Sequence, residues 1–335
     1  MPNIPPVLTT DLSGKTVLVT GANIGLGLEV AKHFARMNPQ KLIVTTRSVE
    51  KGEATVAAIA RETGFTRTEA RVLELTRFDS VLSFVDQFKK ENSSLNILVA
   101  NAAIALTKFE LTPDNWETER ISHRLFPITV YKVNHLSTAL LTFLLLPLLS
   151  TAAQNGSPSR AVIVSSGIHA SVSLSGDKFA SNVLEKLSTG ENYECFTQYS
   201  YSKLLNILFT RALARHLAPT SGVIVDTVTP GYFFSGPRRY NEDQTPFNTP
   251  ELKAIEITAE QASRNVIYAA IAGKVNAETF QGAYISSESQ IIPPSDWVLS
   301  AEGHRAEEQI WAETIEILSK VSPDLQQIVN TYTKA

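Results

Sequence analysis

Residues 19–30, VTGANIGLGLEV, place three glycines in one turn between an apolar stretch and the start of an amphipathic one. Glycine weakens the interior of strands and helices, so its concentration here indicates a close approach to the backbone. In a turn that follows a strand and opens a helix, Gly21 permits the tight bend. Gly25 and Gly27 then make room for a pyrophosphate and a neighbouring strand, and the helix N-terminus supplies free N–H groups. No Lys-Ser/Thr pair follows, which argues against nucleotide hydrolysis, whereas a methyltransferase or a purely structural turn stays open.

The first 230 residues alternate short β-branched runs with helical patterns. Strands that are apolar on both faces and alternate with helices predict a parallel sheet covered on both sides. The expected fold class is therefore α/β, a doubly wound parallel sheet of Rossmann type with about seven strands. We expect a single domain over residues 1–335, with its core at about 12–290 and a C-terminal helical extension at about 300–335. The expected strands are 16–20, 42–46, 70–75, 95–103, 160–166, 222–231 and 282–287.

The composition is that of an ordinary soluble globular protein, with 43% hydrophobic and 19% charged residues and a net charge of −3. No basic excess indicates nucleic acid as a partner. The single cysteine, Cys195, excludes an intrachain disulfide and suits a reducing compartment, so we expect a cytoplasmic protein. The six histidines have no metal-ligand spacing, and no metal is expected.

Residues 136–153, LSTALLTFLLLPLLSTAA, are about as apolar as a membrane span. Pro147 interrupts this stretch, Ser and Thr occur throughout it, and aromatic or basic anchors do not flank it. These features favour a buried helix over a membrane-spanning one.

The spacing TGxxxGxG in residues 20–27 resembles that of the short-chain dehydrogenase/reductase family in its non-extended form. The resemblance continues in the family's order to about residue 235, although Ala100 and Ala103 replace the Asn and Gly of the family's NNAG segment. The later matching segments are VANAAI at 99–104, the Asn at position 134, VIVSS ending at Ser166, YSYSK at 199–203 and TPG at 229–231.

Tyr199 and Lys203 have the spacing that puts a phenol and an amine on one helix face. A free tyrosine has a pKa near 10, and a nearby lysine lowers that pKa by stabilising phenolate. The resemblance implies that Tyr199 is the general acid/base and that Lys203 assists it and holds the nicotinamide ribose. It also implies that Ser166 hydrogen-bonds the substrate oxygen and that Asn134 supports a proton-relay water. Tyr201 is too close to Lys203 in sequence to share a helix face with it.

Arg47 follows the second expected strand, where an acidic residue would bind a ribose 2′-hydroxyl and an arginine suits a 2′-phosphate. We therefore predict NADP(H) as the cofactor rather than NAD. The resemblance implies further cofactor contacts at Gly21, Asn23, Ile24, Gly25, Gly27, Glu74, Leu75, Asn101, Tyr199, Lys203, Pro230 and Gly231.

Two segments are longer than the family's usual pattern. Residues 119–132 are either a genuine insertion or a gene-model artefact, and Pro127 predicts that they leave the helix as a loop and rejoin it near Val133. The stretch from Ser166 to Tyr199 is also long, as in retinol-dehydrogenase-like members and fungal reductases of secondary metabolism. His169 in that stretch lines the pocket or is an ordinary loop histidine.

The sequence predicts an NADP(H)-dependent oxidoreductase that interconverts a ketone or aldehyde and an alcohol on a medium-to-large lipophilic substrate, in secondary metabolism. Two alternatives are a dinucleotide-binding regulatory or scaffold protein without turnover, and a non-redox cyclase or isomerase on the same fold. The aromatic residues that could line an apolar pocket, or belong to the core, are Phe179, Phe196, Tyr232, Phe233 and Phe234.

A homodimer or homotetramer is expected, built on the helices that begin near Asn134 and Tyr199. Both helices are too apolar around their circumference for one buried stripe, and family members commonly pair these helices between subunits.

Overall fold

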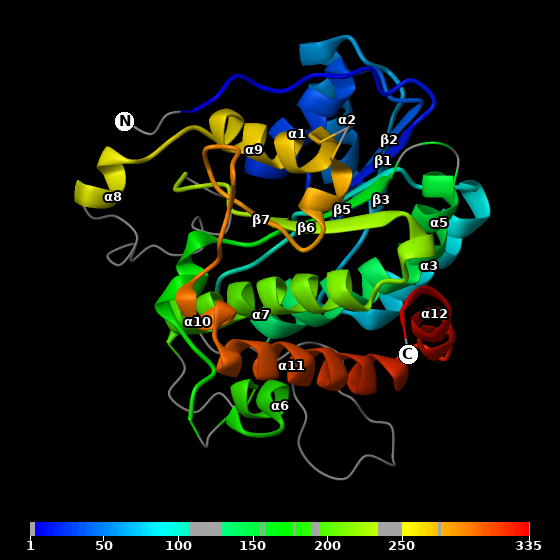
Figure 1. Cartoon of the computed structure of the whole chain (residues 1–335). Helices are drawn as coiled ribbons and strands as arrows, with labels where there is room; N and C mark the ends of the chain where they lie inside the picture. The colour runs from blue at the N-terminus through cyan, green and yellow to red at the C-terminus, as the bar shows by residue number, and fades with distance from the viewer. Residues whose placement is uncertain are drawn as a thin grey trace.

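The computed structural model describes residues 4–106, 129–154, 156, 158–176, 179–188, 194–233, 250–273 and 276–334. These residues form an eight-stranded sheet in the order β3-β2-β1-β4-β5-β6-β7-β8, with helices on both of its faces (Figure 1). The predicted doubly wound α/β fold is confirmed. The strands are β1 Thr16–Val19, β2 Lys41–Thr46, β3 Thr68–Val72, β4 Ile97–Ala100, β5 Ser159–Val164, β6 Val223–Val228, β7 Tyr284–Ile285 and β8 Ile291–Ile292.

The strands from β1 to β7 are parallel, and β8 runs antiparallel to β7. Strand β1 pairs with β2 on one side and with β4 on the other, so the chain reverses its direction of travel across the sheet at this point. In open α/β sheets the crevice at such a switch point, at the carboxyl ends of the strands, is where ligands bind. The eighth strand was missed because two exposed isoleucines carry no strand periodicity.

Helices α1, α2 and α9 lie on one face of the sheet, and α3, α5 and α7 lie on the other (Figure 1). The helix bounds are α1 Gly25–Arg36, α2 Val49–Thr63, α3 Phe78–Glu91, α4 Thr129–Tyr131, α5 Thr138–Gln154, α6 Val183–Leu187, α7 Cys195–His216, α8 Pro250–Ala254, α9 Ala259–Ile271, α10 Asp296–Leu299, α11 Ala301–Ser319 and α12 Asp324–Tyr332. Two C-terminal helices, α11 and α12, therefore make up the expected extension.

Helix α4, a π-helical segment at Lys132–Ser137 and α5 follow one another without a break. The described chain is already helical at Thr129, four residues before the predicted rejoining point near Val133, so the expected loop does not extend to Val133. Residues 107–128, which hold Pro127 and most of the expected loop, lie outside the described residues. The extra residue of a π turn falls beside Asn134, a placement that is frequent at functional sites.

Among the described residues, Thr129–Gln154 is the helix that is long and apolar enough to cross a membrane. Of its most apolar window 83% is buried against the rest of the chain, as predicted for a core helix. Pro147 lies inside α5 and does not end it.

The two C-terminal helices form a further layer over α5 and α7. Helix α11 packs along α7, and α12 packs on α5 (Figure 1). The Trp311 ring of α11 lies 5.4 Å from Phe143 and 6.4 Å from Phe209, between centroids. The surplus apolar surface of α5 and α7 is thus covered within the chain, so it no longer argues for a subunit interface on these helices.

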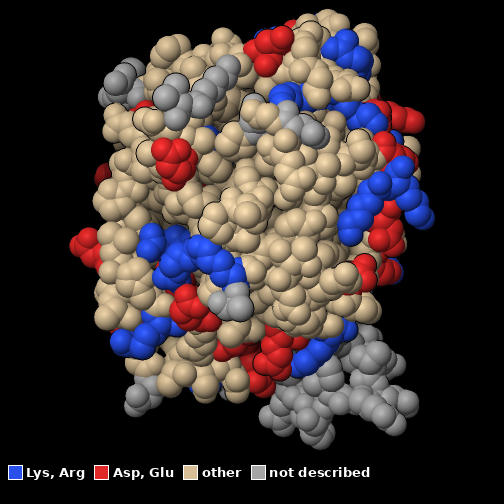
Figure 2. Space-filling model, turned by 45° about the vertical axis from the view of Figure 1, so that its right-hand side comes forward, with Lys and Arg blue, Asp and Glu red and all other residues tan. Residues whose placement is uncertain are grey.

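On the face shown in Figure 2, basic side chains lie next to acidic ones around the edges, and the centre carries few charges. A continuous basic surface, which nucleic-acid binding requires, is not visible on this face. This agrees with the net charge of −3.

Candidate active site

The glycine turn connects β1 to α1 at the switch point of the sheet. Gly21 and Gly25 have φ angles of +64° and +58°, in the left-handed region that favours glycine. A Cβ on Gly21 would lie 2.9 Å from the Cα of Ala102, and a Cβ on Gly27 would lie 2.5 Å from the Gly21 carbonyl oxygen. Gly27 therefore serves the packing of α1 against its own turn and the end of β4. Helix α1 has no side-chain cap from Ile24, so its first N–H groups suit an anion such as a pyrophosphate.

Thr20 and Asn101 fasten this turn to the end of β4. The Thr20 hydroxyl accepts hydrogen bonds from the backbone N–H groups of Asn101 and Ala102, both at 3.0 Å. The Asn101 side chain donates to the Thr20 carbonyl at 2.8 Å. The floor of the crevice is thus fixed by side chains of two adjacent strand ends.

Lys203 is buried in α7 beside the end of β5. Its Nζ donates to the Val164 carbonyl at 2.9 Å and lies 5.4 Å from the centre of the Tyr199 ring. The Ser165 hydroxyl donates to the Lys203 carbonyl at 2.7 Å, so α7 and β5 are tied in both directions. Burial lowers the pKa of Lys203 to about 7. Because Ser166 directly follows Ser165, the structure brings three of the four predicted catalytic residues to one end of β5 and α7.

Asn134, the fourth predicted catalytic residue, binds both neighbouring segments. Its Oδ1 accepts from the Ile104 N–H at 2.8 Å, and its Nδ2 donates to the Ile104 carbonyl at 2.9 Å. The same Nδ2 donates to the Ser202 hydroxyl at 3.0 Å, which in turn donates to the Tyr199 carbonyl at 2.7 Å. The Asn134 side chain thus links the segment after β4 to the backbone of Tyr199.

Sequence reasoning assigned no role to Ser202 or Thr229. Ser202 relays Asn134 to Tyr199, and the Thr229 hydroxyl accepts the Gly167 N–H at 3.0 Å, next to Ser166. The signals were available, because Ser202 lies three residues after Tyr199 on the same helix and Thr229 opens the TPG segment.

The predicted cofactor residues lie at the carboxyl ends of several strands. Arg47 is exposed directly after β2, and the Glu74–Leu75 pair follows β3. Leu75 is buried, and its carbonyl accepts from the Ser137 hydroxyl at 2.7 Å. Pro230 and Gly231 follow β6, where Gly231 has a φ of +84° and a Cβ would lie 3.0 Å from Ser287. Since carboxyl ends of parallel strands share one edge, these positions face the same crevice.

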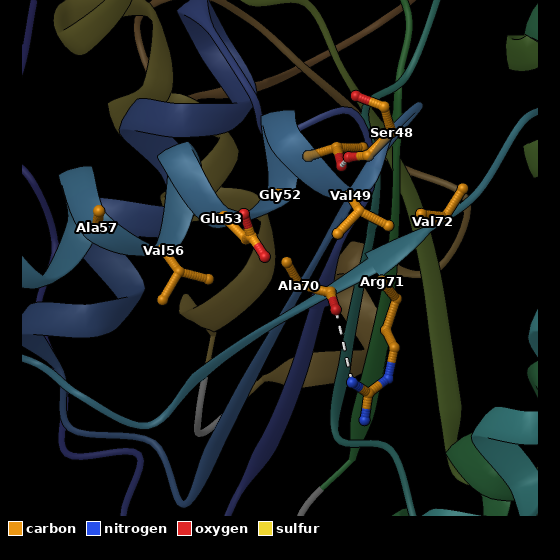
Figure 3. Close-up of a pocket in the computed structure, with 10 residues that line it drawn as sticks. Ser48, Val49, Gly52, Glu53, Val56, Ala57, Ala70, Arg71 and Val72 are labelled. Atoms are coloured by element: carbon orange, nitrogen blue, oxygen red, sulfur yellow. Dashed lines mark hydrogen bonds between the residues drawn. The ribbon is translucent and has the colours of Figure 1, made fainter.

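A cavity of about 470 Å³ lies between α2 and β3, beside the end of β2 (Figure 3). Figure 3 shows Val49 and Val56 of α2 pointing toward β3, with Glu53 between the two elements. Two lining residues, Thr46 and Ser48, flank Arg47, and the predicted catalytic residues are not among the lining residues. The cavity therefore adjoins Arg47, the residue expected to bind the 2′-phosphate, and is separate from the predicted catalytic residues.

The aromatic residues considered for an apolar pocket differ in burial. Phe233 is buried in the cluster around α1 and α9 and pairs with Ile257 through a β-bridge. Phe179 is buried against Tyr201, with ring centres 5.9 Å apart, while Phe196 and Tyr232 are partly buried. Phe234 lies outside the described residues.

A glycine turn at the switch point of a doubly wound parallel sheet defines a nucleotide-binding protein of the Rossmann class. Residues 15–175 match the family model described as short chain dehydrogenase. The chain is 31% identical over 328 residues to the short-chain dehydrogenase/reductase ffsI of Aspergillus flavipes, covering 96% of this chain and 91% of that protein. It is 30% identical over 326 residues to phmF of Phaeosphaeria nodorum, with coverages of 96% and 91%. The chain belongs to the short-chain dehydrogenase/reductase family.

Among solved structures, the fold resembles that of an NADPH-bound carbonyl reductase from chicken fatty liver. The TM-score is 0.58 at 21% sequence identity, over 85% of this chain and 95% of that chain. Membership of the family makes the protein an oxidoreductase that uses a nicotinamide dinucleotide.

Proposed function

We propose that the protein is an NADP(H)-dependent reductase that interconverts an aldehyde or ketone and an alcohol on a medium-to-large lipophilic substrate. The observation that carries this proposal is the buried Lys203 amine beside the Tyr199 ring, at the strand end that also bears Ser166. A phenol next to a buried cation is a suitable proton donor for a developing alkoxide. The resemblance to fungal reductases of secondary metabolism supports the lipophilic substrate class, and we propose that the chain 1–335 acts as one catalytic unit.

Each catalytic residue has a proposed task. The nicotinamide, when bound, supplies or takes up the hydride. Tyr199 donates a proton from its hydroxyl to the substrate oxygen during reduction, and Lys203 favours the phenolate that remains. Ser166 holds the substrate oxygen through its Oγ. Asn134, whose side chain binds Ile104 and Ser202, keeps the segment after β4 and the backbone of Tyr199 in register.

The cofactor fits the crevice from its phosphates outward. The N–H groups of the turn from Gly21 to Gly27, with Asn23 and Ile24 between, bind the pyrophosphate. Arg47 binds the 2′-phosphate, and the Glu74–Leu75 pair lies beside the adenine. Asn101 shapes the crevice floor, and Pro230 with Gly231 lies beside the nicotinamide end.

A panel of carbonyl compounds and alcohols tests the proposal. We expect the enzyme to reduce nitrobenzaldehyde, phenanthrenequinone or decanone with NADPH. The decrease in absorbance of the reduced cofactor measures the rate. NADPH binding without oxidation by any compound of a broad panel would favour a regulatory or scaffold protein. Conversion of a substrate without net cofactor oxidation would favour a cyclase or isomerase.

Arg47→Asp tests the cofactor preference. We expect NADPH to bind more weakly by about 1.5–3 kcal/mol, roughly ten- to a hundredfold, because a charge-assisted contact to the 2′-phosphate is lost. NADH, which lacks that phosphate, should lose much less. Dissociation constants for both cofactors, from quenching of tryptophan fluorescence, measure the difference.

Arg61→Asp is the matched control for this change. Arg61 lies in the last turn of α2, the helix that begins just after Arg47, and is exposed, so the variant has the same charge change away from the crevice. It should leave the ratio of the two dissociation constants unaltered. Equal losses of NADPH and NADH in Arg47→Asp would remove Arg47 from the phosphate site.

A further inference from the structure

His169 lies three residues after Ser166, in the 3₁₀ turn at Gly167–Ser171. It is buried, with 2% of its surface exposed, and both of its ring nitrogens have partners. Nδ1 is 2.9 Å from the Ser166 carbonyl oxygen, and Nε2 is 3.1 Å from the backbone nitrogen of Ser295. The ring therefore bridges a proposed catalytic residue and a residue far along the chain.

The partners determine the proton position on the His169 ring. The Ser295 N–H can only donate, so Nε2 must be the acceptor. The ring proton is then on Nδ1, which donates to the Ser166 carbonyl. In an imidazolium ring, the Nε2–H would point at the N–H of Ser295, and the two donors would repel each other. Burial also lowers the pKa of His169. Both effects favour the neutral ring.

The peptide unit between Ser166 and Gly167 is held at both of its polar groups. Its carbonyl accepts from His169 Nδ1 and also from the His169 backbone N–H at 3.2 Å. Its N–H donates to the Thr229 hydroxyl at 3.0 Å. A peptide unit bonded on both sides cannot rotate freely, so the direction in which the Ser166 side chain leaves the backbone is fixed.

The ring itself is held by the neighbouring strand. His169 packs edge-on against Tyr284 of β7, with ring centres 5.1 Å apart and planes at 68°. The Tyr284 side chain in turn hydrogen-bonds that of Thr229. The two groups that fix the peptide unit, His169 and Thr229, therefore brace each other through Tyr284.

The C-terminal segment also contacts the loop after Ser166 at a second point. Glu302 of α11 accepts from the Ser175 hydroxyl at 2.9 Å and from the Trp297 indole N–H at 3.1 Å. The segment 295–302 therefore contacts the loop after Ser166 at two points, through Ser295 at His169 and through Glu302 at Ser175.

We propose that His169 is a positioning residue for Ser166, which it ties to the C-terminal segment through the N–H of Ser295. The inference rests on the proposed function, because it requires that Ser166 bind the substrate oxygen. His169 does not touch the substrate in this role and acts only through the Ser166–Gly167 peptide unit.

Ser295→Pro removes the backbone N–H that donates a hydrogen bond to His169 Nε2. Ser295 has a φ of −58°, which proline adopts without strain, and its Oγ has no hydrogen-bond partner in the described part of the chain. We expect kcat for the carbonyl compound that is turned over fastest to fall by about tenfold, because sub-ångström misplacement of a reacting group is costly. The dissociation constant for NADPH should not change. Ser295→Ala, which keeps the N–H, is the matched control and should retain the wild-type kcat.

Two His169 variants separate the two bonds. The amide of His169→Asn reaches the position of Nδ1 and can still donate to Ser166, whereas that of His169→Gln reaches the position of Nε2. We expect His169→Asn to keep a higher kcat than His169→Gln, whichever of the two variants has the higher thermal stability. His33→Gln replaces another buried histidine, paired with Glu260 at 3.1 Å on the opposite face of the sheet, and should leave kcat unaltered.

The inference is overturned if folded Ser295→Pro keeps the wild-type kcat, or if Ser295→Ala loses as much. If Ser295→Pro does not fold, a His169→Asn variant no better than His169→Gln overturns it. Ser166→Ala distinguishes this failure from that of the proposed function. Loss of kcat in Ser166→Ala with none in Ser295→Pro rejects the role of His169 alone, and an unaltered kcat in Ser166→Ala rejects the proposed site.

Discussion

Tyr199→Phe is expected to lower kcat/KM for carbonyl reduction by roughly 10²–10⁴-fold, the usual contribution of a positioned general acid. The variant removes only the hydroxyl, so the ring stays beside the Lys203 amine. NADPH binding should be retained, because the pyrophosphate is held by the turn after β1. Steady-state kinetics and a fluorescence titration of NADPH measure the two effects separately.

Tyr201→Phe is the control within the same helix. Tyr201 packs against Phe179, and burial raises its pKa, so its hydroxyl is a poorer proton donor at neutral pH. We expect Tyr201→Phe to keep the wild-type kcat/KM. A Tyr199→Phe enzyme with undiminished kcat/KM would remove Tyr199 from the chemistry.

Arg160→Met is expected to lower the free energy of unfolding by about 2–6 kcal/mol, because the buried Asp226 carboxyl and the Ala272 carbonyl both lose their hydrogen-bond partner, at about 1–3 kcal/mol each. Arg160 lies 3.3 Å from Asp226 between β5 and β6, and both side chains are buried. Burial raises the pKa of Asp226 to about 8, and the guanidinium opposes this rise. Arg160 also donates to the Ala272 carbonyl at 2.6 Å and lies over the Phe280 ring. Urea unfolding followed by circular dichroism measures the loss.

Two further variants define the cause of that loss. Arg160→Met combined with Asp226→Leu removes both polar partners and should recover part of the stability. Arg264→Met breaks a more exposed pair with Glu260 and should cost about 1 kcal/mol or less. A loss in Arg160→Met as small as that in Arg264→Met would show that the buried pair does not support the fold.

The elements that could be predicted from the sequence are those with a long, repeated pattern. The glycine turn lies between β1 and α1 as expected, and the strand order places it at the switch point. Strands that are apolar on both faces, such as β2 and β5, were also found close to their observed bounds, because the centre of a parallel sheet buries both faces.

Features that depend on tertiary contacts were not predicted. The apolar surplus of α5 and α7 was assigned to a subunit interface, since the sequence does not show that α11 and α12 fold back over these helices. Gly27 was expected to make room for a pyrophosphate and a neighbouring strand, and the close approach of the Gly21 carbonyl oxygen within its own turn was not expected. The π segment beside Asn134 has no local signature comparable to a cap or a turn.

The candidate site was predicted as a set of residues, and its connections were not. The motif spacings selected Ser166, Tyr199 and Lys203, and the structure places them at one strand end. The bonds from Asn134 through Ser202 and from His169 to Ser295 cross about 70 and 126 positions of sequence. Contacts at such separations depend on the fold and leave no periodic pattern.

Isotope transfer from the cofactor tests the central claim most directly. The wild-type enzyme is supplied with NADPH deuterated at the transferable position and with the carbonyl compound that it reduces fastest, and the product is analysed by mass spectrometry. We predict an alcohol with one deuterium on the former carbonyl carbon, formed roughly 10²–10⁴-fold more slowly by Tyr199→Phe. The result that would contradict hydride transfer at this site is an unlabelled product from the wild-type enzyme, both with NADPH deuterated on one face of the nicotinamide and with NADPH deuterated on the other.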